Sequence, residues 1–389
     1  MSSLSALILD DREGIIAASP GATRLRRLAD VKILSGSLEQ LTADELARVD
    51  ILVPIRERTA LNADTLSRMP SLKLVLQTGG HAYHLDAGYC SDRGIPVALS
   101  RHAIAPKAAV PELTFALAVS ALRKIPAAHQ SMINGQWMPF MGRTLNGRTL
   151  GILGYGRHGA NVAHIASAYG MHVVAWQRGE YSASDDVRRL SLEQLLAESD
   201  VVSIHLKLSE QSRGLLNGKR LAQMKLGSVL INTSRGAIVD ESALVSALQT
   251  GPLAAAALDV FAVEPLPEDS PLRRLPNVVL TPHIGWTVEE TLLEFADIAA
   301  DQLEAYLEGR LARSELHDSN VTLPASSVGG LAPAEVAVSG RDDTTGVSHV
   351  SSTSCGCGEG NKISHDAIQA NSSTSATEEP MPERRTNEE

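Results

Sequence analysis

Three polar side chains with complementary chemistry follow three apolar segments in the second half of the sequence. Arg235 comes after SVLINTS, Glu264 after AALDVFAV, and His283 after NVVLTP. Each segment is short and apolar, so we expect parallel strands that end just before these residues. Ligands bind at the carboxyl ends of the strands in an open parallel sheet. We therefore expect Arg235, Glu264 and His283 to face one site.

These residue types suit the transfer of a hydride between a secondary alcohol and a nicotinamide. The hydroxyl proton needs a base, and His283 is the candidate because imidazole titrates near neutrality. A carboxylate at Glu264 would stabilise the imidazolium and fix the ring. Arg235 would hold a substrate carboxylate and polarise the adjacent carbonyl. Taken singly, the three also have structural explanations: a turn cap, a solvated carboxylate and an ion pair.

A glycine-rich turn lies upstream of these residues. The stretch TLGILGYGRHGANVAHIASAYG places Gly154, Gly156 and Gly159 between a strand pattern and a helix pattern. In that context the glycines permit a tight turn, close approach of a pyrophosphate and close packing of helix on strand. The pattern predicts a dinucleotide site. The cofactor contacts expected in this loop are Tyr155, Gly156, Arg157 and His158.

The end of the next strand pattern, HVVAW, distinguishes two coenzymes. An acidic residue there would bond the ribose 2′-hydroxyl of NAD, whereas a basic one would accommodate the 2′-phosphate of NADP. The sequence has Gln177 and Arg178. A guanidinium pairs with phosphate in a fork, and Lys207, after VVSIHL, would add a second positive charge. These residues favour NADP, unless Arg178 merely faces solvent.

Strand-like and helix-like segments alternate along most of the chain. Apolar runs separated by helix-length segments indicate parallel sheets covered by helices on both faces. The sequence predicts an α/β protein with two doubly wound parallel-sheet domains, a Rossmann cofactor domain being inserted in a flavodoxin-like substrate domain. The expected strands lie in SALILDD, VKILSG, ILVPI, LKLVLQTGG and IPVAL, then in TLGILGYG, HVVAWQR, DVVSIHL, SVLINTSRG, AAALDVF and NVVLTPHIG.

We expect residues 1–101 and 287–319 to form the substrate domain and residues 102–286 the cofactor domain. An Ala-rich helix after Pro111 would connect the sheets, and a later amphipathic helix would pack on it and return to the first domain. Residues 320–389 contain too few apolar side chains to offset the entropy cost of ordering. A disordered tail is expected there.

Composition narrows the range of partners. The 389 residues carry a formal net charge of −10, which argues against nucleic acid and anionic membrane surfaces. The sequence shows no secretory signal pattern and no run near ~18 apolar residues, so we expect a cytoplasmic protein that binds a small anionic molecule. Its three cysteines form neither a disulfide framework nor a spaced zinc motif, and no metal is expected.

The sequence resembles the D-isomer-specific 2-hydroxyacid dehydrogenases, a family that includes D-3-phosphoglycerate dehydrogenase and the glyoxylate and hydroxypyruvate reductases. The resemblance covers roughly residues 51–309. It rests on the glycine loop, on GSVLINTSRGAIVDESALVSAL and AALDVFAVEPLPEDSPLRRLPNVVLTPHIG, and on the order Arg, Glu, His. It implies the fold given above, a cleft between two domains, and the roles given to Arg235, Glu264 and His283.

The resemblance implies further contacts. Asp259 would contact the nicotinamide carboxamide, Thr233 and His205 would lie along the cofactor, and the connecting helices would form a homodimer. Lys207 stands where the family often has proline.

The family also binds the substrate carboxylate through backbone amides of a loop in the first domain, which corresponds here to residues 77–81. Thr78, Gly79 and Gly80 are therefore expected to bind substrate, although Tyr83 replaces a commoner Asp or Asn. Three large side chains are expected either to wall the pocket or to pack in the core: Trp286, Trp137 and Met141.

The leading hypothesis is an NAD(P)-dependent oxidoreductase that interconverts a small 2-oxo acid and its D-2-hydroxy acid. One alternative keeps the hydride chemistry but takes another small anion, such as a phosphonate, phosphite or formate. A second alternative is a dinucleotide-sensing binding protein, because corepressors that resemble this family keep the fold. Turnover of 2-oxo acids would distinguish these hypotheses.

Overall fold

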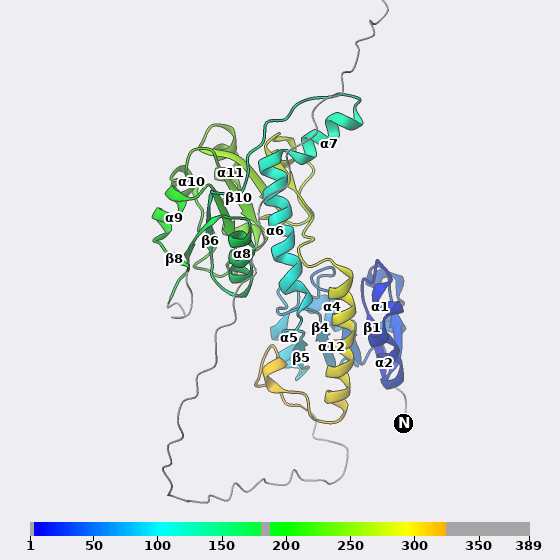
Figure 1. Cartoon of the computed structure of the whole chain (residues 1–389). Helices are drawn as coiled ribbons and strands as arrows, with labels where there is room; N and C mark the ends of the chain where they lie inside the picture. Colours follow the sequence, from blue (N-terminus) through cyan, green and yellow to red (C-terminus); the bar gives the residue numbers. More distant parts are fainter. Residues whose placement is uncertain (1–3, 180–186, 324–389) are drawn as a thin grey trace, which may run out of the picture. The chain divides into compact units, whose positions relative to one another are not determined.

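The first of two parallel sheets lies in the amino-terminal part of the chain. The computed structural model, drawn in Figure 1, describes residues 4–179 and 187–323. Within these residues the first sheet has five strands. Its strand order, β2-β1-β3-β4-β5, is the flavodoxin-like order. Its strands are β1 (Ser5–Ile8), β2 (Asp30–Ile33), β3 (Ile51–Val53), β4 (Leu74–Gln77) and β5 (Val97–Leu99).

The second sheet has seven parallel strands within the described residues, in the order β12-β11-β10-β9-β6-β7-β8. Successive strands are added first on one side of β6 and then on the other, which is the strand order of a Rossmann fold. Its strands are β6 (Thr149–Leu153), β7 (His172–Trp176), β8 (Arg188–Arg189), β9 (Val201–Ile204), β10 (Ser228–Asn232), β11 (Leu253–Leu258) and β12 (Val278–Leu280). The predicted fold class is confirmed. Only β8 lacked a sequence signal among these strands, because it consists of two arginines at the sheet edge.

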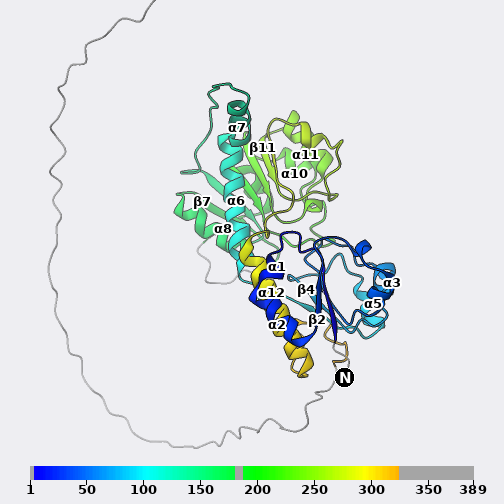
Figure 2. The same ribbon diagram turned by 90° about the vertical axis from the view of Figure 1, so that its right-hand side faces the viewer.

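Helices cover both faces of the first sheet (Figure 2). Buried side chains of α1 (Ile15–Ala18), α2 (Pro20–Leu28) and α12 (Glu289–Leu307) pack on one face. Those of α3 (Ala43–Ala47), α4 (Ala63–Ser67) and α5 (Ala87–Asp92) pack on the other. Strands buried on both faces are apolar at every position, which is why the sequence shows runs rather than alternation.

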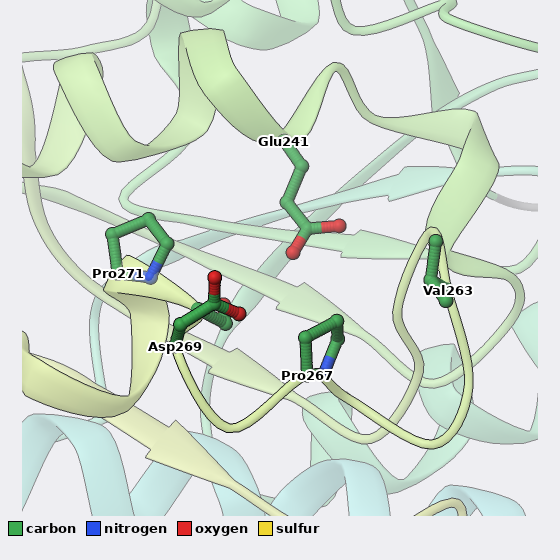
Figure 3. A pocket seen from close by; sticks show the side chains of 6 residues that line it. Glu241, Val263, Pro267, Asp269 and Pro271 are labelled. Atoms are coloured by element: carbon green, nitrogen blue, oxygen red, sulfur yellow. The ribbon is translucent and has the colours of Figure 1, made fainter.

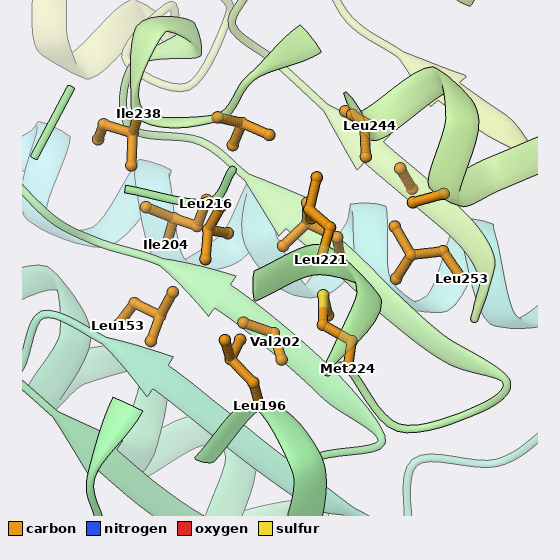
Figure 4. Packing of buried hydrophobic residues seen from close by; sticks show 14 of the residues in the cluster. Leu153, Leu196, Val202, Ile204, Leu216, Leu221, Met224, Ile238, Leu244 and Leu253 are labelled. Atoms are coloured by element: carbon orange, nitrogen blue, oxygen red, sulfur yellow. The ribbon is translucent and has the colours of Figure 1, made fainter. Parts of the chain in front are cut away.

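The second sheet is covered in the same way. Helices α6 (Ala105–Arg123) and α8 (Arg157–Ala168) pack on one face. Helices α9 (Leu192–Glu198), α10 (Gly218–Ala222) and α11 (Glu241–Gln249) cover the other, where their leucines meet those of the strands (Figure 4). This packing makes the sheet a rigid base for the loops at its carboxyl edge.

The connecting helix α6 starts earlier than its sequence suggests. It begins at Ala105, with Pro111 in its interior, rather than after Pro111. Proline has no N–H, so the carbonyl of Lys107, four residues earlier, loses its helical donor. The side-chain amide of Asn161 donates to this carbonyl instead, at 3.0 Å. A contact from α8 therefore allows the proline inside the helix, and no local pattern could indicate it.

Helix α12 returns the chain to the first sheet, as expected. It packs against α2, where a Cβ on Gly21 would lie 2.4 Å from the backbone carbon of Ala296, so only glycine fits there. Helix α12 also contacts α6, and its Glu294 carboxylate accepts hydrogen bonds from the backbone N–H groups of Ile104 and Ala105. The carboxylate thus caps the amino terminus of α6. The predicted domain boundaries themselves stay a proposal.

The end of the described chain extends past the predicted boundary at residue 319. Val321 is buried, and Leu323 packs against the first core. The rest of the expected tail, residues 324–389, lies outside the described residues. In the part of the chain that the structure does describe, no helix has the length and apolarity needed to cross a membrane.

Candidate active site

The predicted site residues lie just beyond the carboxyl ends of the strands. The glycine loop follows β6, Gln177 and Arg178 follow β7, and His205 follows β9. Arg235, Glu264 and His283 come after β10, β11 and β12 in turn, and residues 78–80 follow β4. Parallel strands bring these loops to the same edge of each sheet.

The glycine loop has the geometry of a dinucleotide cradle. Gly154 has a φ of 99°, and a Cβ there would lie 2.7 Å from the carbonyl oxygen of His205. A Cβ on Gly159 would lie 2.2 Å from the carbonyl oxygen of Gly154, whereas no atom lies within 4 Å of a Cβ placed on Gly156. The first and third glycines are thus needed for packing, and the second leaves the amino terminus of α8 accessible to a phosphate.

Two histidines beside this loop are suited to a neutral role. Burial lowers the pKa of His205 to about 3, and burial also lowers the pKa of His158. The Nε2 of His205 lies 2.8 Å from the Oγ of Ser203. The Nδ1 atoms of both histidines are buried and have no hydrogen-bond partner. These nitrogens fit a bound polar group, as expected for a cofactor site.

The basic residues that were expected to select the coenzyme lie on adjoining loops. Arg178 is exposed and donates a hydrogen bond to the carbonyl oxygen of Gln211. That oxygen belongs to the loop after β9, which begins near Lys207, and the Ser212 hydroxyl donates to the Lys207 carbonyl at 2.7 Å. Arg178 is therefore tied to the Lys207 loop, and Lys207 itself is exposed.

His283 and Glu264 form the predicted pair. The Nδ1 of His283 lies 2.7 Å from Oε2 of Glu264, while Oε1 accepts a hydrogen bond from the Phe261 N–H at 2.9 Å. Burial raises the pKa of Glu264, but the bond and charge of His283 outweigh it, so the net shift is downward. The carboxylate is therefore ionised at neutral pH and can stabilise an imidazolium.

His283 is held in an uncommon backbone conformation by Asp259. Its φ is 56°, in the left-handed region. The buried Asp259 carboxylate accepts hydrogen bonds from the Thr281 hydroxyl at 2.5 Å and from the N–H groups of Ile284 and Gly285 at 2.9 Å. Asp259 thus fixes the turn that carries His283, and its expected contact with the nicotinamide carboxamide stays a prediction.

Arg235 is positioned by the turn after β10. The Asn232 side chain accepts from the Ser234 N–H and donates to the Arg235 carbonyl, both at 3.0 Å. A Cβ on Gly236 would lie 1.9 Å from the carbonyl carbon of Phe261, so glycine alone lets the Arg235 turn approach the Glu264 loop. The neighbouring Thr233 is buried, with its hydroxyl 3.1 Å from that of Thr114.

Arg235 also contacts residues that follow strands of the first sheet. Its Nη2 lies 2.6 Å from the Nε2 of His81 and 3.6 Å from the Oε1 of Glu57. The Nη2 of Arg56 lies 3.2 Å from the same His81 nitrogen. A guanidinium only donates, so Nε2 must accept and the ring proton must sit on Nδ1. That nitrogen lies 3.1 Å from Glu57.

The expected substrate loop surrounds Arg56. Gly79 has a φ of 100°, and a Cβ there would lie 2.0 Å from Nη1 of Arg56. The Thr78 hydroxyl accepts a hydrogen bond from the Arg56 N–H at 2.7 Å, whereas Gly80 is exposed and has open space around it. Tyr83 stacks on His81 with ring centroids 4.6 Å apart. The loop backbone is thus shaped around a buried guanidinium.

The three large side chains expected near the pocket behave differently. Trp286 is buried in the first core, and the guanidinium carbons of Arg56 and Arg58 lie 5.4 and 5.3 Å from its ring centre. The Trp286 ring therefore lies against the guanidinium of Arg56. Trp137 and Met141 are each 88% exposed, so within this chain they neither wall a site nor pack in the core.

Arg56 and Glu57 were not among the predicted site residues. They follow β3 in IRERT, as Arg235 follows β10, so the same strand-end argument would have found them. Their relevance appears only in the fold, which places them beside Arg235 although they are far from it in sequence.

A pocket of about 220 Å³ lies beside the loop after β11 (Figure 3). It holds none of the predicted site residues, and the Glu241 carboxylate at its wall accepts a hydrogen bond from the Ala262 N–H. Its lining residues are Glu241, Val263, Pro267, Asp269, Ser270 and Pro271. Across residues 4–179 and 187–323, no three His, Cys, Asp or Glu side chains are grouped as metal ligands would be.

Comparison with known sequences identifies the family of this chain. Residues 115–285 match the model of the D-isomer specific 2-hydroxyacid dehydrogenase, NAD binding domain. The chain is 39% identical over 263 residues to a glyoxylate reductase of Aeropyrum pernix, covering 64% of this chain and 78% of that protein. It is 32% identical over 317 residues to a D-3-phosphoglycerate dehydrogenase of Methanocaldococcus jannaschii, covering 79% of this chain but only 59% of the relative.

Solved structures show the same architecture. The structure of a phosphoglycerate oxidoreductase from Vibrio cholerae superposes with a TM-score of 0.69 at 31% identity, covering 78% of this chain and 98% of that chain. A D-lactate dehydrogenase from Aquifex aeolicus, in complex with NAD and lactic acid, gives a TM-score of 0.69 at 27% identity, covering 80% and 98%.

The glycine loop yields a test that separates packing from binding. We expect Gly156→Ala to leave the melting temperature within about 2 °C of wild type, because its Cβ meets nothing, while NAD(P)H binding weakens about tenfold or more. Gly159→Ala should instead lower the melting temperature by several degrees, because its Cβ meets backbone. Thermal unfolding and fluorescence titration measure the two effects. Equal losses of stability would contradict the assignment.

Proposed function

Because the chain belongs to the D-isomer specific 2-hydroxyacid dehydrogenase family, NAD-dependent oxidoreductases that act on CH–OH groups, we propose that it reduces a small 2-oxo acid to the D-2-hydroxy acid. The observation that carries the proposal is the 2.7 Å contact between His283 and an ionised Glu264, on loops next to that of Arg235. The fit of the glycine loop to a pyrophosphate supports a nicotinamide dinucleotide as the hydride source.

The proposed reaction assigns each proton and charge to a residue. A reduced nicotinamide dinucleotide, held through its pyrophosphate at the glycine loop, would supply the hydride to C2 of the 2-oxo acid. The His283 imidazolium gives its proton to the carbonyl oxygen, so that a hydroxyl forms and the imidazole becomes neutral. Arg235 holds the substrate carboxylate, and Glu264 stabilises the imidazolium before the proton leaves. In the oxidative direction the neutral imidazole takes the hydroxyl proton back.

The wild-type protein should oxidise NADPH or NADH with at least one of glyoxylate, hydroxypyruvate, pyruvate, 2-oxoisocaproate and phenylpyruvate.

His283→Ala should lower kcat by about 10²–10⁴-fold with nearly unchanged coenzyme affinity, since the proton donor is lost. Glu264→Gln should move the basic limb of the reduction profile to lower pH, because an uncharged partner stabilises the imidazolium less. Absorbance at the reduced-nicotinamide band measures all three.

His172→Ala is a suitable control, because His172 is exposed at the amino end of β7, at the edge of the sheet opposite the proposed site. Near-full activity of His283→Ala would overturn the assignment. Tight coenzyme binding without turnover of any 2-oxo acid would direct attention to phosphite, formate and phosphonates in the oxidative direction, and then to a sensing role.

The coenzyme preference is proposed to be NADP. Gln177 and Arg178, which follow β7 in the described part of the chain, carry no negative charge that would repel a 2′-phosphate. Arg178 donates a hydrogen bond to the carbonyl of Gln211, on the loop that begins near Lys207. Two exposed cations on adjoining loops would together attract a dianion such as the 2′-phosphate. The D-lactate dehydrogenase of similar fold binds NAD, so the choice rests on these residues alone.

Arg178→Ala should weaken NADPH binding about 10- to 100-fold while NADH binding changes little, because only the phosphate loses its charged partner. Arg188→Ala serves as the matched control, since it removes another exposed guanidinium that pairs with Glu198 at 3.0 Å. Fluorescence titration with both coenzymes measures the ratio. An equal loss for both coenzymes would remove Arg178 from the phosphate site.

A homodimer is proposed through α7 (Ile125–Ile133) and the loop that follows it. Apolar side chains are exposed together along this segment, which a single chain leaves in water. A second copy of the chain would cover them, as the family resemblance implies. The exposed residues are Ile125, Met132, Ile133, Trp137, Met138, Phe140 and Met141.

Light scattering should give twice the mass of one chain. The double variant Trp137→Asp and Met141→Asp should release monomers, because two charges in an apolar contact are costly to desolvate. Leu226→Asp is the control, since Leu226 is exposed to a similar degree elsewhere on the chain. A wild-type monomer, or a double variant that stays dimeric, would exclude this surface.

A further inference from the structure

Glu57 places a negative charge among the cations of the proposed substrate site. Its Oε1 lies 3.1 Å from Nδ1 of His81 and 3.6 Å from Nη2 of Arg235, and its Oε2 lies 3.3 Å from Nε of Arg56. Burial raises the pKa of Glu57, but nearby cations, Arg56 first among them, outweigh this effect and lower the pKa overall. The side chain is therefore a carboxylate at neutral pH.

The side chains of Arg56, Arg235, Glu57 and His81 together carry one net positive charge. Arg56 and Arg235 contribute two positive charges and Glu57 one negative charge. His81 is neutral, because burial and the nearby Arg56 lower its pKa to about 3. Glu264 is paired with His283, so it does not change this sum when the imidazole is protonated.

Arg58, the next basic residue after Arg56, is already paired with a carboxylate. Both terminal nitrogens of Arg58 lie 2.7 Å from the Glu13 carboxylate, and one donates to the Asp10 carbonyl at 2.6 Å. Arg58 is therefore engaged in a fork with a carboxylate and supplies no free charge to a second anionic group. One monoanion neutralises the Arg56, Glu57 and Arg235 set, whereas a dianion leaves excess negative charge near Glu57.

We propose that Glu57 determines substrate specificity by restricting the site to 2-oxo acids that carry no negative charge besides the 2-oxo carboxylate. The inference rests on the proposed function and adds the class of substrate. A side chain bearing a phosphate or a second carboxylate is repelled by Glu57, while a neutral side chain of the same shape is accepted. Like-charge juxtaposition in a partly buried site is costly, so one residue can set this preference.

The test compares two substrates of the same shape and different charge. Oxaloacetate is a dianion, and its 4-amide is a monoanion. The wild type should prefer the amide at least about tenfold in kcat/KM, and Glu57→Gln should shift this ratio toward the dianion about 10- to 100-fold. Glu57→Asp keeps the charge and should keep the preference. A compound that is not turned over is measured as a competitive inhibitor of the best 2-oxo acid.

Glu198→Gln is the matched control, because it removes a carboxylate that pairs with Arg188 at 3.0 Å and so leaves the cations around Glu57 compensated as before. NAD(P)H affinity monitors folding of each variant. The inference would be overturned if the wild type preferred the dianion, or if Glu57→Gln did not raise the relative kcat/KM for the dianion. The proposed function would still hold in either case, provided that the protein turns over 2-oxo acids. Absence of turnover with every 2-oxo acid would overturn both. If Glu57→Gln fails to fold, the wild-type preference and that of Glu57→Asp decide.

Discussion

The hydrogen bonds accepted by the Asp259 carboxylate determine the position of the proposed acid and base. Burying this carboxylate is unfavourable, and burial raises the pKa of Asp259. Three donors from the turn around His283 offset the cost and hold that residue at a φ of 56°. A conformation that few side chains adopt is thereby fixed, and Nδ1 of His283 meets Glu264.

The positions of the other site residues depend on close backbone approaches that only glycine permits. Gly236 brings the Arg235 turn against the Phe261 backbone, and Gly79 leaves room for the guanidinium of Arg56. Gly159 seats α8 on the turn after β6. In each case a methyl group would displace a loop that carries a charged or phosphate-binding group. Packing density, rather than hydrogen bonding, therefore sets the accuracy of these parts of the site.

Residues from loops of both sheets meet at His81. This neutral imidazole accepts from Arg235 and Arg56, and its Nδ1 lies 3.1 Å from the Glu57 carboxylate, so three charged groups surround one ring. Tyr83 joins this cluster, since its ring stacks on His81 and its ring centre lies 5.7 Å from the guanidinium carbon of Arg235. The charge balance of the site is thus a property of the whole cluster and of no single residue.

The sequence alone determined the fold class, nearly every strand, and Arg235, Glu264 and His283 as the candidate triad. These features are local: apolar runs, the glycine spacing and the polar residue after each run follow from the chain within about ten positions. Only the tertiary structure decided the start of α6, where Asn161 replaces the donor that Pro111 lacks, and the exposure of Trp137. It alone brought Glu57 to Arg235, because contacts between residues far apart in sequence depend on how packed elements meet and leave no periodic trace in the chain.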